Sequence, residues 1–428
     1  MKLKVFNSTF FQLTGVFLGS FALIVVTLAW LGMACEGDSG TGCSNTPVVA
    51  INPDFTSVPL STLYHNTFAI KSDGTLWGWG SNDVGQIVTG TGRNNINVPT
   101  QIGSDRDWAT VSTGWYHVMA IKTNGTLWSW GSNDYGQLGN GTSGYQSGNK
   151  SIPKQVGTDR DWIAVAAGDQ HTAALKRDHS LWTWGWNKAG QLGNGNLNDI
   201  TKPTRVGADN DWVKVAAGQS YTIALKQDGT IWSWGNNNKG ELGYRTDTAF
   251  PNPVPRKIGT DTDWKDVFTG GFNAGLKQNG TLWVWGEDVY GITGDKAKMI
   301  QIPGSGWQTV SVGNNQGFAL KSGGGWYGWG MDVLFDLEIA GKNYLPPTQP
   351  TQITGNDLTT AIWKNYVQPT QPIQLTGGAW NVLIAGYDYS YGVKGDGSLW
   401  AWGKNSLGEL ASGNFTDIKV PANVWKIK

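Results

Sequence analysis

Residues 107–139 read DWATVSTGWYHVMAIKTNGTLWSWGSNDYGQLG, and this stretch recurs along the chain with variations. It contains short runs of residues that favour β-strands, such as those at 118–122 and 127–131. Between these runs lies Asn124-Gly125, a dipeptide typical of the two-residue hairpin turn, in which both positions need a positive φ. The stretch therefore predicts short antiparallel strands joined by tight turns.

The motif Trp-x-Trp-Gly marks the repeat, and its copies end at Gly80, Gly131, Gly185, Gly235, Gly286 and Gly403. A variant, Trp326-Tyr-Gly-Trp-Gly330, makes seven copies, separated by steps of 51, 54, 50, 51, 44 and 73 residues. Further hairpin dipeptides occur at Asp73-Gly74, Asp228-Gly229, Asn279-Gly280 and Asp396-Gly397. Four strands per unit in seven units predict an all-β fold, a seven-bladed β-propeller.

The copy at residues 215–243, VAAGQSYTIALKQDGTIWSWGNNNKGELG, resembles the RCC1 (regulator of chromosome condensation) repeat, and the resemblance covers roughly residues 55–428. It implies a seven-bladed propeller, in agreement with the count of motifs. Some members of that family contact a small GTPase through a blade insertion, and others bind chromatin. We do not carry these roles over, because the chain has an export-type N-terminus and no basic tail.

Three regions are expected: a signal peptide or signal anchor at 1–34, a flexible tether at 35–54, and the propeller at 55–428. The chain finishes with Val420-Pro421-Ala-Asn-Val424-Trp425, which resembles the start of another unit, whereas the first unit begins incomplete near Val58. We therefore expect the ring to close by pairing of the N- and C-terminal strands.

The N-terminal region indicates export. Residues 16–34 carry no charge, follow Lys2 and Lys4, and end before Cys35. Three interpretations stay open: a bacterial-type lipoprotein with Cys35 lipidated, a soluble secreted protein, and an uncleaved anchor. Each places the protein in the cell envelope or outside the cell. Cys43 is the only other cysteine, and it could pair with Cys35 if that residue is not lipidated.

The 73-residue step contains an insertion near residues 350–372. The segment at 350–355, PTQITG, resembles PIQLTG at 372–377, and subtracting this spacing of 22 leaves 51 residues, the ordinary period. The insertion carries Trp363 and Tyr366 and is either a benign surface loop or a partner contact.

No catalytic constellation appears in the sequence. The chain has 32 basic and 32 acidic residues and four histidines, so a nucleic-acid partner is not expected. We predict no metal and no cofactor, because no histidine or cysteine pair has metal spacing. His117, His171 and Tyr221 share one repeat position, which favours a structural hydrogen-bonding role. Acids before the repeated tryptophan are interpreted as turn or strand-start residues, namely Asp107, Asp161, Asp211 and Asp263.

The positions between the repeated glycine and the next strand differ from copy to copy. Because equivalent loops of a propeller gather on one face, we predict a protein-binding face there. Its candidate residues are Trp115, Tyr116, His117, Asp169, Gln170, His171, Tyr221, Phe272, Tyr387, Asp388 and Tyr389, with Trp363 and Tyr366 from the insertion.

The preferred function is a monomeric, non-enzymatic, exported interaction module that binds an unknown protein and touches the membrane only through its N-terminal segment or lipid. Two alternatives stay open. One is a secreted inhibitor of a β-lactamase-type enzyme, since some secreted relatives of the repeat family use aromatic loops in this way. The other is an exported lyase or hydrolase with a site at the mouth of the channel.

Overall fold

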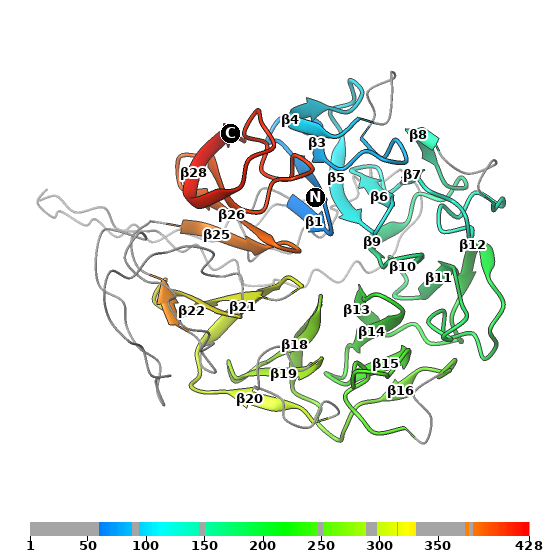
Figure 1. The fold of residues 1–428 in the computed structure, drawn as a ribbon. Coiled ribbons are helices and arrows are strands. Elements are labelled where there is room, and N and C mark those ends of the chain that lie inside the picture. The colour runs from blue at the N-terminus through cyan, green and yellow to red at the C-terminus, as the bar shows by residue number, and fades with distance from the viewer. Residues whose placement is uncertain are drawn as a thin grey trace, which may run out of the picture. The chain divides into compact units, whose positions relative to one another are not determined.

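The computed structural model describes residues 60–87, 94–144, 150–246, 251–287, 298–314, 316–330, 373–375 and 380–427. These residues form seven four-stranded antiparallel sheets. Figure 1 shows the sheets arranged about a common centre as the blades of a propeller. The predicted seven-bladed β-propeller is confirmed. The described residues contain no helix, and so none that could cross a membrane.

Each blade is one continuous stretch of chain whose strands pair in chain order. Blade 1 has β1 (Leu60–Leu63), β2 (Asn66–Ile70), β3 (Leu76–Gly80) and β4 (Ile96–Gln101). Blade 2 has β5 (Trp108–Thr113), β6 (His117–Lys122), β7 (Leu127–Gly131) and β8 (Lys150–Gln155). Blade 3 has β9 (Trp162–Ala167), β10 (His171–Lys176), β11 (Leu181–Gly185) and β12 (Ile200–Arg205). Blade 4 has β13 (Trp212–Ala217), β14 (Tyr221–Lys226), β15 (Ile231–Gly235) and β16 (Arg256–Lys257).

The remaining blades follow the same order. Blade 5 has β17 (Trp264–Thr269), β18 (Phe272–Lys277), β19 (Leu282–Gly286) and β20 (Ile300–Ile302). Blade 6 has β21 (Trp307–Val312), β22 (Gln316–Lys321), β23 (Trp326–Gly330) and β24 (Ile373–Leu375). Blade 7 has β25 (Trp380–Ala385), β26 (Tyr389–Lys394), β27 (Ser398–Gly403) and β28 (Ile418–Lys426).

The expected closure by pairing of the N- and C-terminal strands is wrong. Strand β28 pairs with β27 of its own blade, and β1 pairs with β2. The segment that contains Pro421 is the fourth strand of blade 7, just as Pro99 lies in the fourth strand of blade 1. After each Trp-x-Trp-Gly motif the chain returns to the free edge of the same sheet, so each blade is complete in itself.

The hairpin turns also differ from the expected type. Gly125 has a φ of 78° and Asn124 is not among the residues with positive φ, so a single left-handed residue makes the turn. The Asn124 side chain accepts hydrogen bonds from the backbone N–H and the hydroxyl of Thr126, at 3.0 and 2.7 Å. This side-chain bond holds the turn in place of a second residue with positive φ.

The main packing lies between blades. The second tryptophan of each Trp-x-Trp-Gly motif is buried against the preceding blade, as Trp130 is against Phe68 and Ile87. In blades 1 to 5 its indole N–H also donates to a loop carbonyl of that blade; Trp130 bonds the carbonyl of Gln86 at 2.7 Å and Trp184 that of Gln137 at 2.9 Å. The motif therefore joins neighbouring blades through both apolar contact and a buried hydrogen bond.

A second repeated feature is a lysine side chain that lies between two tryptophan rings. The Lys226 ammonium lies 4.6 Å from the ring centre of Trp212 and 5.0 Å from that of Trp232. It also pairs with Asp209 at 2.6 Å and with Asp211 at 3.1 Å. The repeated acids predicted for turn or strand-start positions thus anchor lysines, and the same arrangement holds Lys122, Lys176 and Lys277.

Two sequence predictions fall outside the described residues. They are the N-terminal assignments, with Cys35 and Cys43, and the 350–372 insertion, with Trp363 and Tyr366. Of the two similar segments around the insertion, the one at 372–377 contains β24, which pairs with β23.

Candidate binding face at the channel mouth

The loops between the first and second strands of all seven blades gather around the centre of the ring, because the first strands of successive blades contact one another there. Counting back from the Trp-x-Trp-Gly motif gives one equivalent position in each loop. That position holds Tyr64, Trp115, Asp169, Gln219, Gly270, Asn314 and Tyr387, from blade 1 to blade 7. Large aromatic rings therefore come from blades 7, 1 and 2, and polar or small residues from the others.

Tyr64 joins residues of several blades. Its ring stacks on Trp115 with a centroid distance of 5.0 Å and on Tyr387 at 5.1 Å. Its hydroxyl donates to the carboxylate of Asp169 at 2.9 Å and accepts from the amide of Gln219 at 3.3 Å. Blades 1, 2, 3, 4 and 7 are thereby linked through one side chain.

The backbone of Tyr64 has a φ of 52°, a left-handed conformation that a bulky residue rarely adopts. The ring stacking and hydrogen bonds of the Tyr64 side chain hold the backbone in this strained conformation.

Trp115 also stacks on Tyr116, with ring centres 5.2 Å apart. Together Tyr116, Trp115, Tyr64 and Tyr387 form a row of four rings, which we call the aromatic row. Trp115, Tyr116 and Tyr387 are half-buried, so the row is partly accessible at the mouth of the channel.

Asp169 lies deeper than an ordinary surface carboxylate. Burial raises the pKa of Asp169 to about 7, although the hydrogen bond from Tyr64 acts in the opposite direction. Burial and the neighbouring Asp169 carboxylate together raise the pKa of Tyr64 well above its ordinary value. Above pH 7, where Asp169 is mainly ionised, the phenol is therefore the donor and the carboxylate the acceptor.

A cavity of about 40 Å³ lies next to this pair, which is room for a few water molecules. Its walls include Asp169, Gln219, Tyr64 and Tyr387. Five glycines also line it, namely Gly218, Gly270, Gly271, Gly313 and Gly386, beside other residues such as Leu63, Val312 and Asn314. A Cβ on Gly271 would lie 1.8 Å from the carbonyl oxygen of Asn314, so the backbones approach closely there.

Two residues after Trp115, and at the equivalent position of the next blade, the side chain points inward between blades. The His117 Nε2 lies 3.1 Å from the hydroxyl of Thr172 in the next blade, and that hydroxyl donates to the carbonyl of Gln137. The hydroxyl therefore accepts from the imidazole, which fixes the neutral Nε2–H tautomer. Burial lowers the pKa of both His117 and His171 to about 3. The predicted structural hydrogen-bonding role of this position is confirmed.

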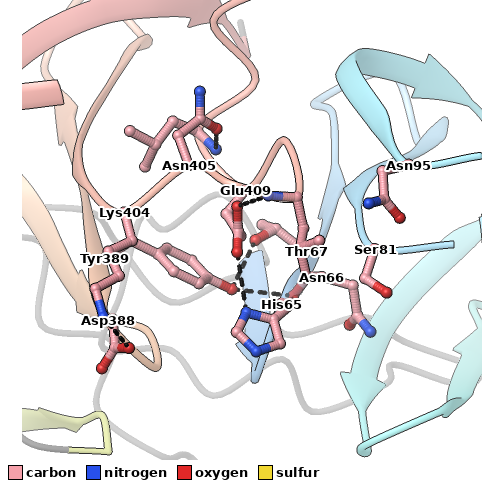
Figure 2. Close-up of polar contacts among 12 residues, drawn as sticks. His65, Asn66, Thr67, Ser81, Asn95, Asp388, Tyr389, Lys404, Asn405 and Glu409 are labelled. Atoms are coloured by element: carbon pink, nitrogen blue, oxygen red, sulfur yellow. Dashed lines mark hydrogen bonds and ion pairs between the residues drawn. The ribbon is translucent and has the colours of Figure 1, made fainter. Parts of the chain in front are cut away.

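Blades 1 and 7 meet at the rim of the face (Figure 2). His65 Nδ1 lies 2.9 Å from the carboxylate of Glu409, whose side chain is 1% exposed. Beside it, Asp388 pairs with Lys404 at 3.3 Å. The backbone carbonyl of Glu409 accepts from the indole of Trp79 at 2.9 Å, which repeats the contact between other blades. The ring thus closes through side chains at this junction.

The structure separates the eleven predicted loop residues into two sets. Trp115, Tyr116, Asp169 and Tyr387 gather around Tyr64, and Gln170 and Asp388 are half-buried in the same loops. The others are buried between blades, so their expected exposure on a face is wrong: His117, His171, Tyr221, Phe272 and Tyr389. Each of these residues begins the second strand of its blade, and these strands are buried at nearly every position.

Sequence analysis missed the central residue, Tyr64. In the first unit Leu63 replaces the glycine that marks this loop in other copies, and Asn66 replaces the histidine or tyrosine. Counting sixteen residues back from Gly80, as from Gly131 to Trp115, would have aligned Tyr64 with Trp115.

The comparisons with known proteins agree with this geometry. A sequence model described as "Regulator of chromosome condensation (RCC1) repeat" matches residues 73–121, 124–175, 178–225 and 228–274. Residues 73–274 are RCC1 repeats. A second RCC1 model matches residues 108–137, 162–191 and 212–241. These matches lie in blades 1 to 5.

Among curated proteins with RCC1-like sequence, the Arabidopsis thaliana ultraviolet-B receptor UVR8 is 34% identical over 142 residues, which is 32% of this chain and 31% of the receptor. The human E3 ubiquitin-protein ligase HERC2 is 32% identical over 139 residues, which is 32% of this chain and 3% of the ligase. The chain therefore spans about a third or less of the length of these relatives.

Two solved structures show the same fold. Prp20p from Saccharomyces cerevisiae has a TM-score of 0.68 at 19% identity, and the match covers 87% of each chain. Human WBSCR16 has a TM-score of 0.64 at 23% identity, covering 80% of this chain and 88% of the other. At these identities the likeness concerns the fold alone.

Proposed function

We propose that this protein is an exported, non-enzymatic interaction module that binds a protein partner through the loops at the channel mouth. The aromatic row carries the proposal. Four stacked rings from three blades form a rigid, partly accessible surface, and tyrosine and tryptophan are the residues that most often anchor protein interfaces. The solved structure of Prp20p is described with its binding to Gsp1p and histones, so a propeller of this kind supports protein binding.

The export part of the proposal rests on the N-terminal sequence. An uncharged stretch of 19 residues after two lysines, followed by Cys35, is the pattern of an export signal. Mass spectrometry of the mature protein tests it. A diacylglyceryl group on Cys35 supports a lipoprotein, and a free amine there supports secretion. An intact, unmodified chain in the cytoplasmic fraction would contradict export.

The binding part is tested by affinity capture, followed by titration of the recovered partner as a pure protein. We expect Trp115→Ala and Tyr387→Ala each to weaken binding of that partner by at least about tenfold, as hot-spot aromatics do. Ile152→Ala is the matched control, because Ile152 is 61% exposed on β8, the outermost strand of blade 2. Equal binding by the wild-type chain and all three variants would contradict the proposed face.

A further inference from the structure

The channel mouth contains a half-buried carboxylate that pairs with no cation of the described residues. Asp169 accepts hydrogen bonds from Tyr64, and among the described residues no lysine, arginine or histidine forms an ion pair with it. A carboxylate in such a place is expensive to keep charged, which is why burial raises its pKa. A positive charge from outside the chain would compensate this carboxylate.

The same fold already shows how it holds a cation. Lys176 lies between the rings of Trp162 and Trp182, 4.7 Å from each ring centre, and pairs with Asp159 and Asp161. Aromatic faces and carboxylates together bind the ammonium group in blades 2, 3, 4 and 5. The aromatic faces and the carboxylates both attract a positive charge electrostatically, and each attraction strengthens when water is excluded.

The cavity beside Asp169 has these components, but no lysine is among the described residues that line it. The cavity next to Asp169 is walled by the Tyr64 and Tyr387 rings, and Gln219 adds an amide oxygen that can accept a hydrogen bond. Five glycines without side chains form part of the remaining wall, which leaves room for a narrow group. The aromatic row extends this wall past Trp115 to Tyr116, over a length that suits a polypeptide better than a single small ion.

We propose that the channel mouth binds a positively charged side chain, arginine or lysine, presented by the protein partner. Asp169 is the counter-ion, and the Tyr64 and Tyr387 rings form the aromatic wall of the site. This inference rests on the proposed function and specifies the chemistry of the partner at the centre of the same face. The incoming cation takes the place of cavity water and shares the Asp169 carboxylate with the Tyr64 hydroxyl.

Defined peptides test the charge directly. The probes are two acetylated pentapeptide amides, Gly-Ser-X-Ser-Gly, in which X is arginine or citrulline, its uncharged near-isostere. Isothermal titration calorimetry at pH 8 with the full chain should show at least about tenfold tighter binding of the arginine peptide. Asp169→Asn should reduce this preference to within about twofold.

Asp73→Asn is the matched control, because it removes one carboxylate at the β2–β3 turn, at the other end of the strands. Asparagine occupies the equivalent position in blades 2 and 5, so the turn is retained. It should leave the arginine preference unchanged. Equal binding of both peptides, no binding up to about 10 mM, or a preference that survives in Asp169→Asn would overturn the inference.

Folding of Asp169→Asn is checked by thermal unfolding at the same pH. The outcome also separates the two proposals. If binding of a captured partner still requires Trp115, while binding of neither peptide changes in Asp169→Asn, the binding face is supported and the cationic side chain at its centre is contradicted.

Discussion

At the residue scale, blades 2, 3 and 4 each contact the next blade through a matched pair of side chains. His117 donates to Thr172, whereas Tyr221 donates to Asn273 at 2.7 Å. In both pairs the acceptor side chain also donates a hydrogen bond to a loop carbonyl of the blade that carries the donor. Thr172 donates to the carbonyl of Gln137, and Asn273 donates to that of the equivalent Glu241. A glycine lies under each ring, since a Cβ on Gly114 would be 2.3 Å from the His117 ring. We therefore expect that one pair can replace the other only if both of its residues are exchanged together.

This interchange predicts a double-mutant cycle. His117→Tyr alone places a longer donor against Thr172, and Thr172→Asn alone leaves His117 badly matched, so each should destabilise the protein by about 1–3 kcal/mol. The double variant recreates the Tyr221–Asn273 pair and should recover most of the loss. Chemical denaturation measures the coupling, and additive single effects would contradict the pairing.

Acid should act through the same histidines. In the folded protein the pKa of His117 is about 3, against about 6.5 when unfolded, so the unfolded chain binds more protons as pH falls below 6.5. Each histidine then reduces stability by roughly 2 kcal/mol between pH 6.5 and 5. The His117→Tyr/Thr172→Asn variant should gain that amount relative to wild type at pH 5 and nothing at pH 8. A pH-independent difference would show that His117 does not carry the effect.

Asp169 should give the opposite pH dependence. Its folded pKa of about 7 exceeds the unfolded value near 4, so the folded state holds the extra proton between these values and stability falls as pH rises. Asp169→Asn keeps an acceptor for Tyr64 and removes the buried charge. Relative to wild type it should become more stable from pH 5 to pH 8, by about 2–3 kcal/mol. A variant that is less stable than wild type at pH 8 would refute this reasoning.

At the element scale, the loop after each Trp-x-Trp-Gly strand is shaped to receive the next blade. Asn187 accepts from the backbone of Leu192 at 3.0 Å, and the carbonyl of Gln191 receives the indole of Trp234 at 2.8 Å. Gly193, with a φ of 68°, lies against that indole. The loop is therefore an interface element as well as a connection between strands.

Two glycines of this loop separate backbone strain from contact between blades. Gly193→Ala would place a Cβ 2.7 Å from the Trp234 indole nitrogen, whereas Gly195, with a φ of 79°, has nothing within 4 Å. Gly195→Ala should cost about 1–2 kcal/mol for its backbone conformation alone. Gly193→Ala should cost a further 1–3 kcal/mol, roughly the loss of a buried hydrogen bond. Equal melting temperatures of the two variants would contradict an interface role for Gly193.

The sequence predicts elements well and their grouping poorly. Trp-x-Trp-Gly and the hairpin dipeptides identify the strands because each reports a local conformation. A period, however, does not define where a unit begins, and the interpretation of the segment around Pro421 as the start of a further unit led to the wrong closure. The channel-mouth loops were predictable from the repeated glycine, but the link from Tyr64 to Asp169 joins residues 105 positions apart and leaves no local pattern.

At the scale of the whole molecule, the ring closes where the first and last blades meet. The Trp77 and Trp425 rings lie 5.2 Å apart, and buried residues of both blades share one apolar cluster that includes Ala69, Trp79 and Tyr391. This junction uses the same contacts as the others but lacks a direct chain connection. Its strength therefore depends on packing and on the Glu409 contacts.

Trp79→Phe should weaken this junction selectively. The variant loses the bonds from the indole to the Glu409 carbonyl and to the Tyr391 hydroxyl. We expect faster amide hydrogen exchange in β1–β4 and β25–β28, because these blades can part without stretching the chain. Trp184→Phe is the control, since the chain joins blades 2 and 3 directly. Identical exchange patterns in the two variants would show that the junction is no weaker than the others.

Because every sheet is a single uninterrupted segment, the order in which the blades follow one another is separable from how they pack. The chain could be opened at any connection between blades, and its present ends joined by a linker, without dividing a sheet. Circularly permuted versions should therefore retain the channel mouth whichever blade comes first. For the same reason a whole blade is a natural unit of duplication or exchange, so the seven loop positions around Tyr64 can be varied one blade at a time.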